Sequence, residues 1–153
     1  MVEILFYHLQ RQPLERVLPL LLEKTLKRGW KAVIRCGSAE RLAMLDDTLW
    51  TWRDNSFLPH GTHIEGQGEK QPIYLTLQYE CPNSAEVLFL VDGAMLDDTT
   101  LDNTLYTRLV LMFDGNDDAQ VKFARTSWKD VTARGLTATY WQQDDADRWV
   151  KKA

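Results

Sequence analysis

The sequence predicts an α/β protein, a single three-layer, Rossmann-like domain with a mainly parallel sheet. Short apolar runs typical of buried strands alternate with amphipathic stretches typical of helices along the chain. The length of 153 residues corresponds to one ordinary domain. With 44% hydrophobic and 26% charged residues, the chain can bury a sizeable core, and no linker divides it.

The first half of the chain alternates strands with two helices. The first helix has apolar residues at spacings of three and four and ends in a basic pair before Gly29. The second helix begins after Ser38, a good N-cap residue. Its predicted buried stripe is Leu42, Leu45, Leu49 and Trp52. The polar stretch 61–71 contains three glycines and predicts a mobile loop. The remaining predicted elements are strand 4–9, helix 10–28, strand 32–36 and strand 72–78.

The second half continues the alternation and ends in a polar segment. Asp117 or Asp118 caps a last helix that runs to about residue 134 and is ended by Gly135. The predicted strands here are 87–91, 109–113 and 138–141, with a short helix within 99–107. We expect the domain to span residues 1–143, with residues 144–153 as a polar C-terminal tail.

Charge and cysteine content exclude several classes of protein. A net charge of −4 argues against a non-specific nucleic-acid binder, which needs a broadly basic surface. A local basic patch, and a weaker contact with single strands through the six tryptophans, stay open. Two cysteines cannot build a disulfide framework or a four-cysteine zinc site. Without a signal peptide or a membrane-spanning run, we expect a soluble, cytoplasmic protein.

The sequence offers little support for catalysis. The turn after the first strand has no glycine, and no phosphate-binding GxxxxGK[ST] motif occurs, so no nucleotide-binding glycine loop is expected. Ser38 at a helix N-terminus could bind an anion, but a helix cap is the favoured interpretation. Cys36, at the end of a strand, is the best candidate nucleophile, although a structural thiol is favoured. We therefore assign no catalytic residues.

Two polar clusters resemble metal sites only superficially. His60 and His63 stand three residues apart, with Glu65 as the one near additional ligand. Two solvated loop histidines are the favoured interpretation. The acidic run 114–118 lacks the ligand spacing of a calcium loop and predicts a strand-to-helix turn. We expect no metal and no cofactor.

The last helix carries a basic stripe beside an indole. At about 100° per residue, Lys122, Arg125 and Lys129 share one narrow sector, and Val121 and Trp128 border it. A short acidic peptide with one or two apolar side chains would match this surface. The alternative is a solvated basic face, with Trp128 as a core residue.

A second unusual surface lies at the end of the second helix. Trp50 points away from the apolar stripe, and Phe57, Leu58 and Pro59 follow soon after it. An aromatic residue off the core face, next to an apolar loop, is a candidate protein-binding patch. The alternative is a loop that folds back and buries both rings.

These segments resemble a known family. The stretch Leu45-Asp46-Asp47-Thr48-Leu49-Trp50, followed by Ser56-Phe57-Leu58-Pro59-His60, is similar to the LDxxLW…SFxPH signature of the chi subunit of bacterial DNA polymerase III. Phe6-Tyr7 in the first strand and Ala124-Arg125 with Trp128-Lys129 in the last helix add to the resemblance. It covers nearly the whole chain.

The resemblance implies a non-catalytic accessory subunit of the clamp-loader complex. Such a subunit binds the acidic C-terminal peptide of the single-stranded DNA-binding protein, and by analogy Arg125, Trp128 and Lys129 would hold that peptide. Lys122 joins them by helical geometry. Trp50, Phe57 and Pro59 would contact the psi subunit or a substitute partner such as a helicase. The competing hypothesis is a small α/β nucleotide-binding or hydrolytic enzyme, with its pocket at the carboxyl ends of the strands.

Overall fold

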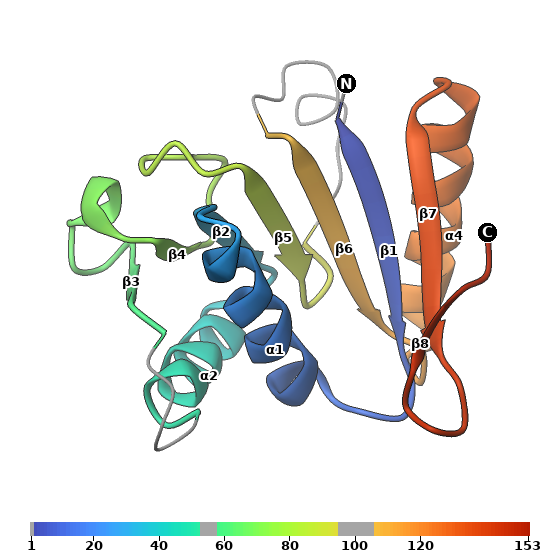
Figure 1. Ribbon diagram of the computed structural model, residues 1–153, viewed down its shortest axis with the longest axis horizontal. Helices are drawn as coiled ribbons and strands as arrows, with labels where there is room; N and C mark the ends of the chain where they lie inside the picture. The colour runs from blue at the N-terminus through green and yellow to red at the C-terminus, as the bar shows by residue number, and fades with distance from the viewer. Residues whose placement is uncertain (1, 53–57, 95–105) are drawn as a thin grey trace.

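A computed structural model describes residues 2–52, 58–94 and 106–153. Its centre is an eight-stranded sheet with the strand order β3-β4-β2-β5-β6-β1-β7-β8 (Figure 1). Every neighbouring pair is parallel except β7 and β8. The strands are β1 Glu3–Leu9, β2 Ala32–Cys36, β3 His60–Thr62, β4 Ile73–Thr76, β5 Val87–Val91, β6 Arg108–Asp114, β7 Thr137–Gln143 and β8 Trp149–Lys151. The helices are α1 Leu14–Lys27, α2 Ala39–Trp50, α4 Asp118–Ala133 and the short 3₁₀ helix η1 Gly68–Lys70.

Helices cover both faces of the sheet, which confirms the predicted α/β architecture. Figure 1 shows α1 and α2 on one face and α4 on the other. The core accordingly has two parts, one under α1 and α2 and one under α4. From β1 the chain crosses through α1 toward β2, whereas from β6 it crosses through α4 toward β7 in the opposite direction. The connections that leave the carboxyl ends of the adjacent strands β1 and β6 therefore run in opposite directions. In α/β proteins a crevice commonly forms at such a point.

Most predicted elements are present, and their boundaries follow local chemistry. Ser38 caps α2 as predicted, because its side chain accepts a hydrogen bond from the Arg41 amide. The helix predicted from residue 10 begins instead at Leu14, because Pro13 occupies the N-cap in an extended conformation. The short helix predicted within 99–107 falls largely on residues outside the described part of the chain.

The stretch 61–71 is more ordered than the sequence suggested. It contains part of β3 and all of η1, so the prediction of a mobile loop was wrong for these residues. β3 pairs in parallel with β4, and a side chain at Gly61 would approach Gln71 within 2.8 Å. The glycine thus permits close packing at the sheet edge rather than flexibility.

The C-terminal segment adds a strand to the other edge. After Gln143 the chain turns, and the Asp144 carboxylate accepts hydrogen bonds from the amides of Ala146 and Arg148 at 2.9 and 3.0 Å. β8 then pairs antiparallel with β7. The sequence predicted a polar tail over 144–153 and did not predict this strand. Among the described residues, no helix is long and apolar enough to cross a bilayer.

Candidate functional site

The helix α4 presents its basic residues on its outer side. Asp117 caps the helix by accepting hydrogen bonds from the amides of Ala119 and Gln120, and Gly135 follows the helix end in a left-handed conformation. The residues that face the sheet and are buried are Ala124, Ser127 and Val131. The basic residues Lys122, Arg125 and Lys129 are exposed.

Trp128 lies at the border between this basic surface and the core. It is half-buried, and its ring makes edge-to-face contacts with Phe6 and Tyr140 at centroid distances of 5.3 and 5.9 Å. Contacts of this geometry hold an aromatic ring in one orientation. The indole is therefore fixed by the sheet beneath it while part of it remains accessible beside the cations.

Two further polar residues lie beneath this surface. His8 on β1 and Tyr140 on β7 are joined by a hydrogen bond of 2.6 Å between the imidazole Nδ1 and the hydroxyl oxygen. The pKa of His8 is lowered, first by burial and then by the positive charge of Arg125, while Asp114 raises it. Sequence reasoning missed this pair. Both residues lie on strands, on the face that α4 covers, but only the pairing of β1 with β7 brings them together.

The three cations are available to a ligand. Within the described residues, no carboxylate forms an ion pair with Lys122, Arg125 or Lys129. By contrast, Arg134 at the end of the same helix pairs with Asp130 at 3.5 Å. An exposed cation that makes no ion pair within the protein can pair with an incoming anion. This face of α4 can therefore bind an acidic group.

The described residues of the segment with the LDxxLW…SFxPH pattern, 45–50 and 58–60, lie on the layer opposite α4. Trp50, the last residue of α2, is 59% exposed, and its ring lies 4.7 Å from that of His60. Pro59 is half-buried. Phe57 lies outside the described residues. The structure thus leaves Trp50 on the surface, and it does not bring this patch together with the basic face of α4.

His60 supports the Trp50 surface from below. Its Nδ1 donates to the Leu58 carbonyl oxygen at 2.7 Å, and its Nε2 lies 2.9 Å from a carboxylate oxygen of Asp46. His60 is only 6% exposed, so the interpretation as a solvated loop histidine was wrong for this residue. The reason is that β3 carries it into the sheet edge beneath α2.

Two other metal ligands were suspected: His63 is half-buried, and Glu65 has a structural partner. Glu65 accepts hydrogen bonds from the amide and the hydroxyl of Thr62. In the ranges that the structure describes, no group of three or more potential ligands is placed to hold a metal ion. In the acidic run 114–118, Asp114 accepts a hydrogen bond from the Asn116 amide and Asp117 caps α4, as in a strand-to-helix turn.

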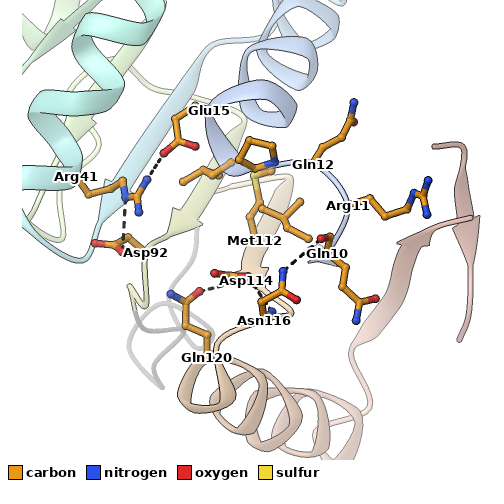
Figure 2. Close-up of a pocket in the computed structure, with 13 residues that line it drawn as sticks. Gln10, Arg11, Gln12, Glu15, Arg41, Asp92, Met112, Asp114, Asn116 and Gln120 are labelled. Carbon is orange, nitrogen blue, oxygen red and sulfur yellow. Dashed lines mark hydrogen bonds and ion pairs between the residues drawn. The ribbon is translucent and has the colours of Figure 1, made fainter. Parts of the chain in front are cut away.

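A cavity of about 350 Å³ opens at the carboxyl ends of β1 and β6, where an α/β enzyme would bind its substrate (Figure 2). Its charges are largely paired with one another. Arg41 contacts Glu15 and lies 3.7 Å from Asp92. Ser38 donates its hydroxyl to Asp92 at 2.8 Å. A carboxylate of the chain itself therefore lies at the N-terminus of α2, where the sequence allowed an external anion.

The remaining candidates for enzymatic chemistry in this region have structural roles. Burial, reinforced by the nearby Asp92, raises the pKa of Cys36 to about 12, so its thiol is not activated. A side chain at Gly37 would lie 1.9 Å from the backbone oxygen of Asp92, so this glycine allows two backbone segments to approach each other. Cys36 and Gly37 therefore serve the packing next to this cavity.

Comparison with known proteins identifies the family of this chain. The chain is 33% identical over 91 residues to a protein described as a probable DNA polymerase III subunit chi from Rickettsia prowazekii (strain Madrid E). The match covers 60% of this chain and 55% of the relative, so the chain spans about half the length of that protein. The family model for the DNA polymerase III chi subunit, HolC, matches residues 1–139. Because that match extends over most of the sequence, the chain belongs to the DNA polymerase III chi subunit family.

Proposed function

We propose that this protein is a non-catalytic accessory subunit of the DNA polymerase III holoenzyme that works in the cytoplasm during DNA replication. In this role it docks the acidic C-terminal peptide of the single-stranded DNA-binding protein and links it to the clamp loader. Membership of the chi family supports the replication role. The basic face of α4 supports the peptide-docking role.

One observation carries the choice of site. Lys122, Arg125 and Lys129 are exposed without ion-pair partners among the described residues, and they lie beside the half-buried Trp128. In the proposed complex, Arg125 pairs with the terminal carboxylate or an aspartate, and Lys129 supplies a second charge. Trp128 forms a wall for a terminal aromatic side chain. Such a small, charge-dominated contact should have a micromolar dissociation constant, about 8 kcal/mol, that weakens with salt.

The second surface would bind a further protein. We propose that Trp50, Phe57 and Pro59 contact the psi subunit or a substitute partner such as a helicase. The exposure of Trp50 supports this proposal, since a large aromatic ring on the surface is typical of interface hot spots. The contact between the indole ring of Trp50 and the buried imidazole of His60 helps to hold the indole in one position.

Fluorescence anisotropy with a labelled C-terminal peptide of the cognate single-stranded DNA-binding protein tests the proposed peptide site. Arg125→Ala and Lys129→Ala should each weaken binding about tenfold, because each removes one charge-assisted contact. Arg16→Ala on α1 is a matched control, since it removes an exposed arginine from the opposite layer. Equal affinity of the wild-type protein and both α4 variants would refute the site.

A further inference from the structure

A second cavity lies on the sheet face opposite α4. It has a volume of about 350 Å³ and lies between α1 and the strands toward the β8 edge of the sheet. Figure 1 shows that α1 crosses this face toward β2, so within the described part of the chain no helix lies over β7 and β8 on this side. We call this cavity the aromatic cleft. Its half-buried aromatic residues are Tyr7, Trp30, Trp141 and Trp149.

The rings of the cleft are held in place by their neighbours. Tyr7 and Trp149 make an edge-to-face contact at a centroid distance of 4.9 Å. The indole nitrogen of Trp141 donates to the hydroxyl of Thr139 at 3.0 Å. The guanidinium of Arg28 lies over the Trp30 ring, 4.0 Å from the ring centroid, in a cation–π contact. Three of the six tryptophans therefore gather in one cleft with preset orientations.

The charges around the cleft are positive. Lys24 and Arg28, near the C-terminal end of α1, are exposed and have no ion-pair partner among the described residues. Arg108 lies 5.2 Å from the centre of the Trp30 ring and pairs with Glu3 at 2.8 Å. No aspartate or glutamate is among the described residues that line the cleft. The protein has a net charge of −4, yet this surface presents an excess of cations.

We propose that the aromatic cleft binds single-stranded nucleic acid. Flat bases would pack against Trp141, Trp149 and Tyr7, and phosphates would lie along Lys24 and Arg28. Grooves that bind single strands combine these two features, aromatic rings for the bases and cations for the backbone. An acidic peptide would match the cations as well, but four aromatic rings in one small cleft favour a ligand with successive flat rings. The net charge of −4 does not oppose this proposal, because the described residues that line the cleft include three cations, of which only Arg108 is paired with a carboxylate, that of Glu3.

Anisotropy with a labelled oligonucleotide of about 12 thymidines, at low salt and with the full chain, tests the proposal. The double variant Lys24→Glu/Arg28→Glu should weaken binding more than tenfold and flatten its salt dependence, because about two phosphate contacts are lost. Trp149→Leu, which keeps an apolar side chain, should weaken binding about fivefold through lost stacking. Circular dichroism checks that both variants are folded.

The matched control is Lys122→Glu/Lys129→Glu, which makes the same change of charge on α4. It should leave oligonucleotide binding within about twofold. Absence of binding up to about 100 µM protein, or equal losses in both double variants, would overturn the proposal. Binding of an acidic peptide that only the cleft variants abolish would also overturn it and assign the cleft to a protein partner. The α4 variants test the proposed peptide site separately, since the two surfaces lie on opposite faces of the sheet.

Discussion

The outer face of α4 and the cavity at the carboxyl edge of the sheet both carry an arginine, but they differ in what surrounds it. Arg125 is exposed and has no ion-pair partner among the described residues. Arg41 contacts Glu15 and approaches Asp92, and all three side chains are less than a third exposed. The same residue type therefore stabilises the fold in one place and stays available to a ligand in the other. Neighbouring carboxylates, rather than the arginine itself, decide the role.

The helix N-termini at the two sites show the same contrast. At the carboxyl edge, the Asp92 side chain lies at the start of α2 and accepts the hydrogen bond from Ser38. This internal carboxylate lies at a helix N-terminus, a position that can otherwise bind an external anion. On α4 the cations lie along the helix and not at its start, so a peptide can approach them from the side.

Gly37→Ala should have the largest effect of any change at the carboxyl edge. The new Cβ would lie 1.9 Å from the backbone oxygen of Asp92 and 2.9 Å from its carbonyl carbon, so the backbone must shift. We expect a loss of about 3 kcal/mol in the free energy of unfolding, measured by urea denaturation. Gly66→Ala is the control. It meets nothing within 4 Å and should cost only about 1 kcal/mol, from its positive φ. Equal losses would contradict the packing role of Gly37.

A comparison of Arg41→Ala with Arg125→Ala tests the contrast between the two arginines directly. Removal of Arg41 leaves the half-buried carboxylates of Glu15 and Asp92 without their cation, and should cost about 1–2 kcal/mol of stability. Removal of Arg125 should change stability by less than about 0.5 kcal/mol. Urea denaturation of both variants gives these values. A loss at Arg125 as large as that at Arg41 would show that Arg125 has an internal structural role.

Local patterns in the sequence were sufficient to predict most of the elements. The apolar runs of β2 and β5 predicted those strands with their observed limits, and Ser38 and Gly135 marked helix ends where the structure has them. The sector occupied by the α4 cations followed from helical geometry alone. These features depend on neighbours within a few residues, and such interactions can be read from a single sequence.

Features that depend on distant contacts could not be predicted. The burial of His60 requires β3 to pair with β4, and the glycine-rich context of β3 concealed the strand. His8 and Tyr140 are 132 residues apart and meet only because β1 pairs with β7. The aromatic cleft likewise combines Trp30 from the α1–β2 connection with Trp149 from β8. Sheet order, which sets all three, has no local signal in the sequence.

The smallest expected effect is a change in the titration of His8. Its pKa lies below the ordinary value of 6.5, mainly because of burial and then because of Arg125. The unfolded chain therefore takes up a proton before the folded protein does as the pH falls. This histidine should lower the stability of the fold as the pH decreases from about 6.5 toward its folded pKa, and have no such effect above that window.

Arg125→Ala should raise the pKa of His8, because it removes a nearby positive charge, and the loss of stability on acidification should become shallower. Asp114→Asn is the control of opposite sign. It removes the negative charge that raises this pKa, so the pKa should fall further. Titration of the imidazole proton resonances by NMR measures both shifts.

Binding of an acidic peptide should raise the pKa of His8 as Arg125→Ala does, since the peptide carboxylates offset the charge of the same guanidinium. If Arg125→Ala left the His8 titration unchanged, Arg125 would not reach this histidine, and the peptide would have no electrostatic link to the core beneath α4.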